Sequence, residues 1–166
     1  MKSPSRGRRS LLPEVLFLVS VLFAPAAFAG AAFDGLALGA SEGAVRQRLP
    51  NAHCQPLQWQ SRAADRRCDD SRARVHGVDV RVTVYLKADA VQAFDLRFES
   101  RYAARFAKLA AERFGSAPVE HKTEKAQVRQ WRAGGEQATL STEPGERRAS
   151  LLVWRGAFYD EIYKVR

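Results

Sequence analysis

The feature that most constrains the fold is a pair of nearby segments in which apolar and polar residues alternate. Apolar residues occupy every second position from 80 to 86 and again from 94 to 98. Because successive side chains of a strand point to opposite faces of a sheet, each segment predicts a strand with one buried face. We expect an antiparallel hairpin with a three-residue loop over 87–89. This register would pair Arg81 with Asp95 and Asp79 with Arg97, opposite charges that favour a ladder.

Helices are predicted before and after this hairpin. The first begins where Ser41 can cap it and Glu42 places negative charge at its positive end, and it ends at Pro50. The second runs from Arg101 to Phe114, because its large apolar residues recur at intervals of three and four. Gly115 directly after it is a typical C-terminal cap.

The C-terminal third repeats the strand signals. Segments 128–133 and 136–141 flank Gly134-Gly135, which predicts a hairpin with Trp131 opposite Ala138. A last strand is expected over 149–154. The fold class predicted is therefore α+β, an antiparallel sheet with two helices on one face. The order of helix, strands, helix and strands suggests a tandem duplication of one helix-plus-strands unit.

Residues 1–29 have the composition of a cleavable signal peptide. A basic start is followed by an apolar run from 11 to 28, and Ala27-Phe28-Ala29 matches the small-x-small cleavage pattern. We expect cleavage after Ala29, with a cut after Ala32 as the alternative. Residues 30–166 would then form a single mature domain.

A membrane anchor is the competing interpretation of this run. Glu14 and Pro25 interrupt it and leave only 15–24 as an unbroken apolar core, which is too short to span a bilayer. The cleavage site has no cysteine to which a lipid anchor could be attached. No later segment is apolar enough to cross a membrane. We therefore expect a periplasmic or secreted protein.

Cys54 and Cys68 are the two cysteines of the chain. An even number of cysteines in an oxidising compartment predicts one disulfide. Thirteen residues separate the two cysteines, whereas a catalytic dithiol usually has two between them. A structural disulfide between Cys54 and Cys68 is the expectation.

The charge of the chain is basic but dispersed. The whole chain holds 27 Lys+Arg and 18 Asp+Glu; without residues 1–29 the counts are 23 and 17, a net charge of +6. Six arginines between 62 and 81 are interspersed with aspartates, so the cationic patch of a nucleic-acid-binding protein is absent from the pattern. We expect no nucleic-acid partner.

No motif for catalysis or cofactor binding is recognisable. His53, His76 and His121 are not at metal-ligand spacing from one another, so no metal and no cofactor are predicted. Adjacent Asp69 and Asp70 would point to opposite faces of a strand and could not act on one bond. An enzyme whose residues are gathered only by the fold remains an alternative.

Aromatic and arginine residues give the best indication of a functional surface. If helices cover one face of the sheet, the other face would carry aromatic and arginine side chains, the residue types that dominate protein interfaces. The expected partner-binding face consists of Arg81, Tyr85, Arg97 and Trp154. The competing interpretation is that each aromatic residue packs at a sheet edge or beneath the C-terminal tail.

Two short segments resemble known envelope domains. The stretch Phe33-Asp34-Gly35-Leu36-Ala37-Leu38-Gly39-Ala40-Ser41-Glu42-Gly43-Ala44-Val45 is similar to the start of small bacterial domains of the BamE type. Phe114-Gly115-Ser116-Ala117-Pro118 is similar to their helix-closing element, and tandem units of this type occur in folds that resemble the β-lactamase inhibitor protein. The resemblance implies a protein-binding scaffold of the cell envelope.

The function expected from the sequence is that of an exported, non-catalytic protein-binding module of the bacterial cell envelope. Its partner would be another envelope or secreted protein. The alternative is an inhibitor or immunity protein that blocks a secreted enzyme.

Overall fold

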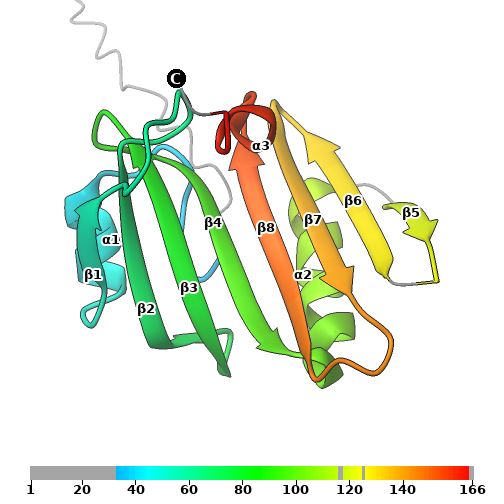
Figure 1. Cartoon of the computed structure of the whole chain (residues 1–166). Helices are drawn as coiled ribbons and strands as arrows, with labels where there is room; N and C mark the ends of the chain where they lie inside the picture. The colour runs from blue at the N-terminus through cyan, green and yellow to red at the C-terminus, as the bar shows by residue number, and fades with distance from the viewer. Residues whose placement is uncertain (1–32, 116–117, 125, 165–166) are drawn as a thin grey trace, which may run out of the picture.

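The computed structural model of the chain describes residues 33–115, 118–124 and 126–164. The predicted signal peptide over 1–29 and both expected cleavage sites lie outside these residues. The described chain forms one sheet of eight strands in the order β1-β2-β3-β4-β8-β7-β6-β5, and every neighbouring pair is antiparallel. Figure 1 shows the sheet with β1 at one edge and β5 at the other.

The elements follow one another as a helix and four strands, then a second helix and four strands, then a short last helix. In chain order they are α1 (Glu42–Arg48), β1 (His53–Pro56), β2 (Arg66–Val75), β3 (Val78–Lys87), β4 (Ala90–Glu99), a 3₁₀ turn (Ser100–Tyr102), α2 (Ala103–Phe114), β5 (Val119–Lys122), β6 (Gln127–Ala133), β7 (Glu136–Thr142), β8 (Arg148–Arg155) and α3 (Phe158–Glu161).

The predicted fold class is wrong in its proportions and in its helices. Strands account for 48% of the structure and helices for 20%, so a large antiparallel sheet dominates and the fold is not a balanced α+β arrangement. The described residues form three α-helices, where two were expected. The additional helix α3 packs in front of the sheet, whereas α1 and α2 lie behind it (Figure 1). The prediction missed α3 because its four residues are too few to show helical periodicity.

The main core lies between the sheet and the two longer helices. Val80, Val82 and Val84 of β3 are buried on this side, as the alternation predicts. Phe106 and Ala110 of α2 are fully buried against the same layer. The two helix boundaries agree with the predicted caps: the Ser41 side chain accepts a hydrogen bond from the Ala44 N–H, and Gly115 ends α2 at a φ of 64°.

The predicted register of the β3–β4 hairpin is wrong. The turn has two residues, because Lys87 pairs with Ala90, and a bulge between Tyr85 and Leu86 then shifts the ladder. Arg81 therefore lies opposite Arg97, and Asp95 lies opposite Thr83. The predicted opposite-charge pairs do not form across this ladder. The other hairpin has the expected register, with Trp131 opposite Ala138.

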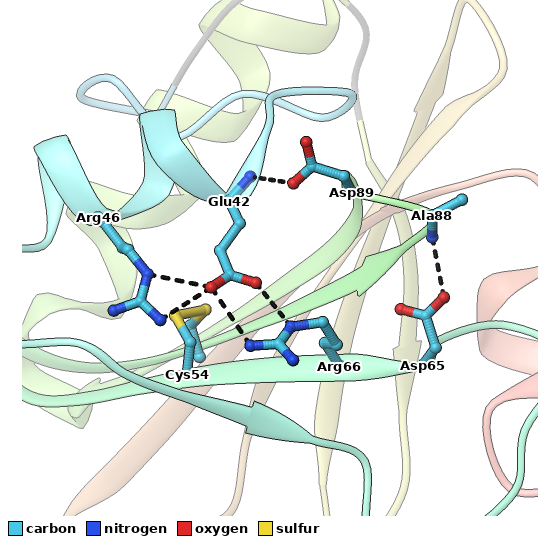
Figure 2. Close-up of polar contacts among 8 residues, drawn as sticks. Glu42, Arg46, Cys54, Asp65, Arg66, Ala88 and Asp89 are labelled. Carbon is cyan, nitrogen blue, oxygen red and sulfur yellow. Dashed lines mark hydrogen bonds and ion pairs between the residues drawn. A yellow bond between two sulfur atoms is a disulfide. The ribbon is translucent and has the colours of Figure 1, made fainter.

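Tertiary contacts hold the unexpected two-residue turn. Ala88 and Asp89 both have positive φ, 47° and 59°, in a sequence without the Asn-Gly pair that such turns favour. Figure 2 shows the compensation: the Asp89 carboxylate accepts a hydrogen bond from the Glu42 N–H at 2.9 Å, and Asp65 accepts one from the Ala88 N–H at 2.9 Å. The N-terminus of α1 and the residue directly before β2 thus fix the turn between β3 and β4.

The predicted disulfide is present. Cys54 of the edge strand β1 and Cys68 of β2 occupy directly opposed positions of the ladder and are bonded through their sulfurs. The Glu42 carboxylate lies beside them and forms an ion pair with Arg66 at 2.6 Å (Figure 2). The bond therefore ties the shortest strand on this side to the sheet. No helix within the described ranges is long and apolar enough to cross a membrane.

Candidate functional site

The sheet face opposite α1 and α2 is only partly covered, and we call it the open face. Its side chains come from the polar positions of the alternating strands, so Thr83 and Tyr85 point to this side while their neighbours in β3 are buried behind. The ladder register arranges the open face in rows across the strands. One row holds Tyr85, Ala93 and Trp154. Two rows further along the strands, another row holds Arg81, Arg97 and Ser150.

A second, smaller core covers the Tyr85 row. Phe158 and Ile162 from α3 and its end are buried against Ala93 and Trp154. The Phe158 ring lies 5.2 Å from the Tyr85 ring, measured between centroids. Trp154 is 6% exposed, and its ring contacts that of Tyr159 at 5.4 Å. The C-terminal segment therefore forms a roof over one end of the open face.

The loop between β1 and β2 fixes this roof in place. The Trp59 indole N–H donates a hydrogen bond to the Ile162 carbonyl at 2.9 Å, and the Ser61 hydroxyl donates one to the Glu161 carbonyl at 3.0 Å. The Trp59 ring also stacks on the ring of Tyr163. These contacts join residues about a hundred positions apart in the chain, so the position of α3 depends on the whole fold.

A hollow of about 290 Å³ opens directly beneath the roof, and we call it the tyrosine hollow. Its roof side is apolar and aromatic, whereas its floor carries the hydroxyls of Thr139, Ser141 and Ser150. Within the described residues these three hydroxyls have no hydrogen-bond partner in the protein. The remaining residues of its lining are Tyr85, Asp95, Arg97, Leu152, Phe158, Tyr159, Ile162 and Tyr163.

Burial shifts the titration of two groups in this hollow. It raises the pKa of Tyr85 to about 12, so the phenol stays a hydrogen-bond donor even in strongly alkaline solution. Burial also raises the pKa of Asp95, although the hydrogen bond from Arg97 at 2.9 Å opposes that shift. The hollow thus contains a carboxylate whose burial costs free energy.

A second hollow of about 190 Å³ adjoins the first, and we call it the arginine hollow. The two share Arg97, which lines both. Arg81 and Arg148 lie in the arginine hollow, and both are exposed to solvent. The other lining residues are Ser71, Asp79, Val80, Phe98 and Glu99.

The structure brings together three of the four residues predicted for a partner-binding face. Tyr85 and Arg97 line the tyrosine hollow, and Arg81 and Arg97 line the arginine hollow. Trp154 lines neither hollow, because α3 buries it. The prediction did not include Tyr159 and Tyr163, which are 60% and 75% exposed beside the tyrosine hollow. The aromatic content of the tail was the sequence signal for them.

No histidine takes part in either hollow of the open face. His53 lies on β1, His76 in the turn after β2 and His121 on β5, so the fold keeps them on separate elements. Asp69 and Asp70 also separate, since Asp69 accepts a hydrogen bond from Thr83 on the open face while Asp70 is buried at a bulge.

Within the described residues, one group of side chains has the spacing of a metal site. Ligand atoms of Glu42, Cys54 and Cys68 lie within 4.8 Å of one another. The two sulfurs are bonded to each other, and Glu42 is paired with Arg66 and Arg46 (Figure 2). These interactions occupy the groups that a metal ion would need, so we assign them a structural role.

The comparisons with known proteins give no family for this chain. No family model matches it, and neither a curated protein nor a solved structure is significantly similar to it. The resemblance to envelope domains of the BamE type therefore stays a prediction.

Proposed function

We propose that the protein is an exported, non-catalytic binding module that holds another protein of the cell envelope, or a secreted one, on the open face of its sheet. The observation that carries the proposal is the tyrosine hollow. Exposed Tyr159 and Tyr163 flank it, and Arg97 and unpaired hydroxyls line it. Tyrosine, arginine and serine in one concave patch form the composition of protein-recognition surfaces.

The rigidity of the roof supports this function. Tyr163 stacks on Trp59 and Tyr159 contacts Trp154, so both exposed rings are held before a partner arrives. A preorganised aromatic side chain loses little conformational entropy on binding. The partly buried carboxylate of Asp95 also supports a binding role, because side chains that cost stability are found where function needs them.

Export is part of the proposal. The disulfide between Cys54 and Cys68 is typical of proteins that fold in an oxidising compartment. N-terminal sequencing and intact mass of the protein recovered from expressing bacteria test it directly. We expect a mature chain beginning at Gly30 with two fewer hydrogens than the reduced form; a chain that keeps Met1 and two free thiols would contradict export.

The binding function is tested with the mature protein immobilised and exposed to envelope extract. We expect one retained protein whose recovery falls at least tenfold with the Tyr159→Ser/Tyr163→Ser variant. Val119→Ser is the matched control, because Val119 is 59% exposed on the far edge strand β5. Circular dichroism of each variant confirms that its sheet is intact.

A second variant separates binding from folding. Ser141→Arg adds bulk to the floor of the tyrosine hollow without removing an aromatic contact of the roof. It should reduce recovery as much as the double tyrosine variant does. Equal recovery by the wild type, Ser141→Arg and the double tyrosine variant would overturn the proposed function.

A further inference from the structure

The open face changes in chemical character along the strands. Its roofed end is aromatic and contains Tyr85, whereas Arg81 lies four residues further along the same strand, about 13 Å away. Arg148 lies two strands away from Arg81 in the same hollow, because β4 separates β3 from β8. The open face thus combines an apolar end with a cationic end.

The cationic end has arginines that no ion pair of the described chain neutralises. The two carboxylates that line the arginine hollow each form an ion pair with an arginine outside it, Asp79 with Arg74 and Glu99 with Arg101, although Glu99 also lies opposite Arg148 on the β4–β8 ladder. In the part of the chain that the structure describes, Arg81 and Arg148 have no such pair and no hydrogen-bonded acceptor. Two exposed guanidinium groups are therefore free to bind anions.

The position of Arg81 is unfavourable for the isolated protein. It lies directly opposite Arg97 on the ladder, and like charges at opposed positions destabilise an antiparallel pair. The ion pair of Arg97 with Asp95 within its own strand weakens this repulsion, but Arg81 has no ion pair of its own among the described residues. A ligand that carries negative charge would supply the missing interaction.

We infer that the partner presents an extended acidic segment, with an apolar residue seated beneath α3 and carboxylates bound by Arg81 and Arg148. This inference rests on the proposed function and specifies the chemistry of the partner. The span of about 13 Å corresponds to about four residues of an extended peptide. The segment should therefore carry its carboxylates three to five residues from its apolar anchor.

Selection of a displayed library of random dodecapeptides on the mature protein tests the inference. Enriched peptides should combine an aromatic or aliphatic residue with two or more Asp or Glu residues at that spacing. Their affinity, measured by fluorescence anisotropy, should fall about tenfold in Arg81→Ala/Arg148→Ala. It should also weaken as NaCl is raised, since exposed ion pairs are screened by salt.

The matched control removes the same charge elsewhere. Lys122→Ala/Arg132→Ala deletes two exposed cations near the β5 edge and should leave the affinity unchanged. If the selected peptides lack acidic residues, or bind equally to Arg81→Ala/Arg148→Ala, the inference fails. Loss of those same peptides in Tyr159→Ser/Tyr163→Ser would then show that the proposed function survives without it. If no peptide depends on either variant, both fail.

Discussion

Arg81 lies directly opposite Arg97 on the β3–β4 ladder, which places two like charges side by side on the open face. A sequence selected for stability alone would favour a carboxylate at one of these positions, because opposite charges across a ladder stabilise it. We interpret the pair as a feature retained for binding, at a cost to the unbound protein.

Replacing Arg81 should therefore stabilise the free protein. Arg81→Glu removes the repulsion and offers Arg97 a second carboxylate, so the free energy of unfolding should rise by about 0.2–1 kcal/mol. Urea denaturation at neutral pH measures the change, with Arg81→Gln as the control that removes repulsion alone. Equal stability of the wild type and both variants would contradict the electrostatic interpretation of the pair.

Asp95 should make stability depend on pH in the opposite direction from an ordinary paired carboxylate. Burial raises its pKa in the folded state, so its contribution is fully present below the unfolded value of 3.8 and is lost as pH rises through the folded pKa. Asp95→Asn keeps an oxygen that can accept the bond from Arg97 and carries no charge. The variant should be more stable than the wild type at pH 7, with a difference that disappears below pH 3.8.

Thermal unfolding of both proteins between pH 3 and pH 8 checks this prediction. A wild type that is more stable than the variant at pH 7, and that loses this advantage toward acid, would reverse the sign and would show that the ion pair with Arg97 outweighs the cost of burial.

Much of the sheet could be predicted from the sequence, because alternation, turn residues and helix caps are local signals. The hairpin around Gly134-Gly135 and the ends of α1 and α2 follow from such signals. The β3–β4 turn could not be predicted in this way. Its conformation depends on hydrogen bonds from Glu42 to Asp89 and from Ala88 to Asp65, residues that are distant in sequence.

The candidate site was predictable only in part, for the same reason. Alternation predicts that Tyr85, Arg81 and Arg97 lie on one face of the sheet. It does not predict which segments of the chain cover that face. Trp154 belongs to that face by alternation and is nevertheless buried, because α3 packs over it. The position of α3 depends on the hydrogen bond from Trp59, more than a hundred residues earlier in the chain.

The turn offers a test of this tertiary control. Ala88 has a φ of 47°, a region that costs a residue with a Cβ about 1–2 kcal/mol and that asparagine tolerates better. Ala88→Asn should therefore raise the free energy of unfolding by about 0.5–1 kcal/mol. Asp89→Gly relieves the same backbone strain but loses the hydrogen bond to the Glu42 N–H, so it should give no gain. Chemical denaturation of the two variants distinguishes them, and a larger gain from Asp89→Gly would contradict the role of that bond.

The disulfide should supply a substantial part of the stability. It closes a loop with a sequence separation of 14 residues, for which the chain-entropy model gives about 3 kcal/mol. Cys54→Ala/Cys68→Ala should lose about that amount in urea denaturation. Reductant should destabilise the wild type to a similar extent and leave the variant unchanged. If reductant also destabilised the variant, the loss of stability would not come from breaking this disulfide.

The central claim is that the open face beneath α3 binds a protein, and site-specific photocrosslinking in cells that export the chain tests it most directly. A benzoylphenylalanine introduced at Tyr163 should give one dominant adduct, identified by mass spectrometry, and the same partner should be captured from Tyr159. The same group at Val119, on the opposite edge of the sheet, should capture none of it. Capture of that partner with equal yield from Val119, or no protein adduct from either tyrosine position, would contradict the claim.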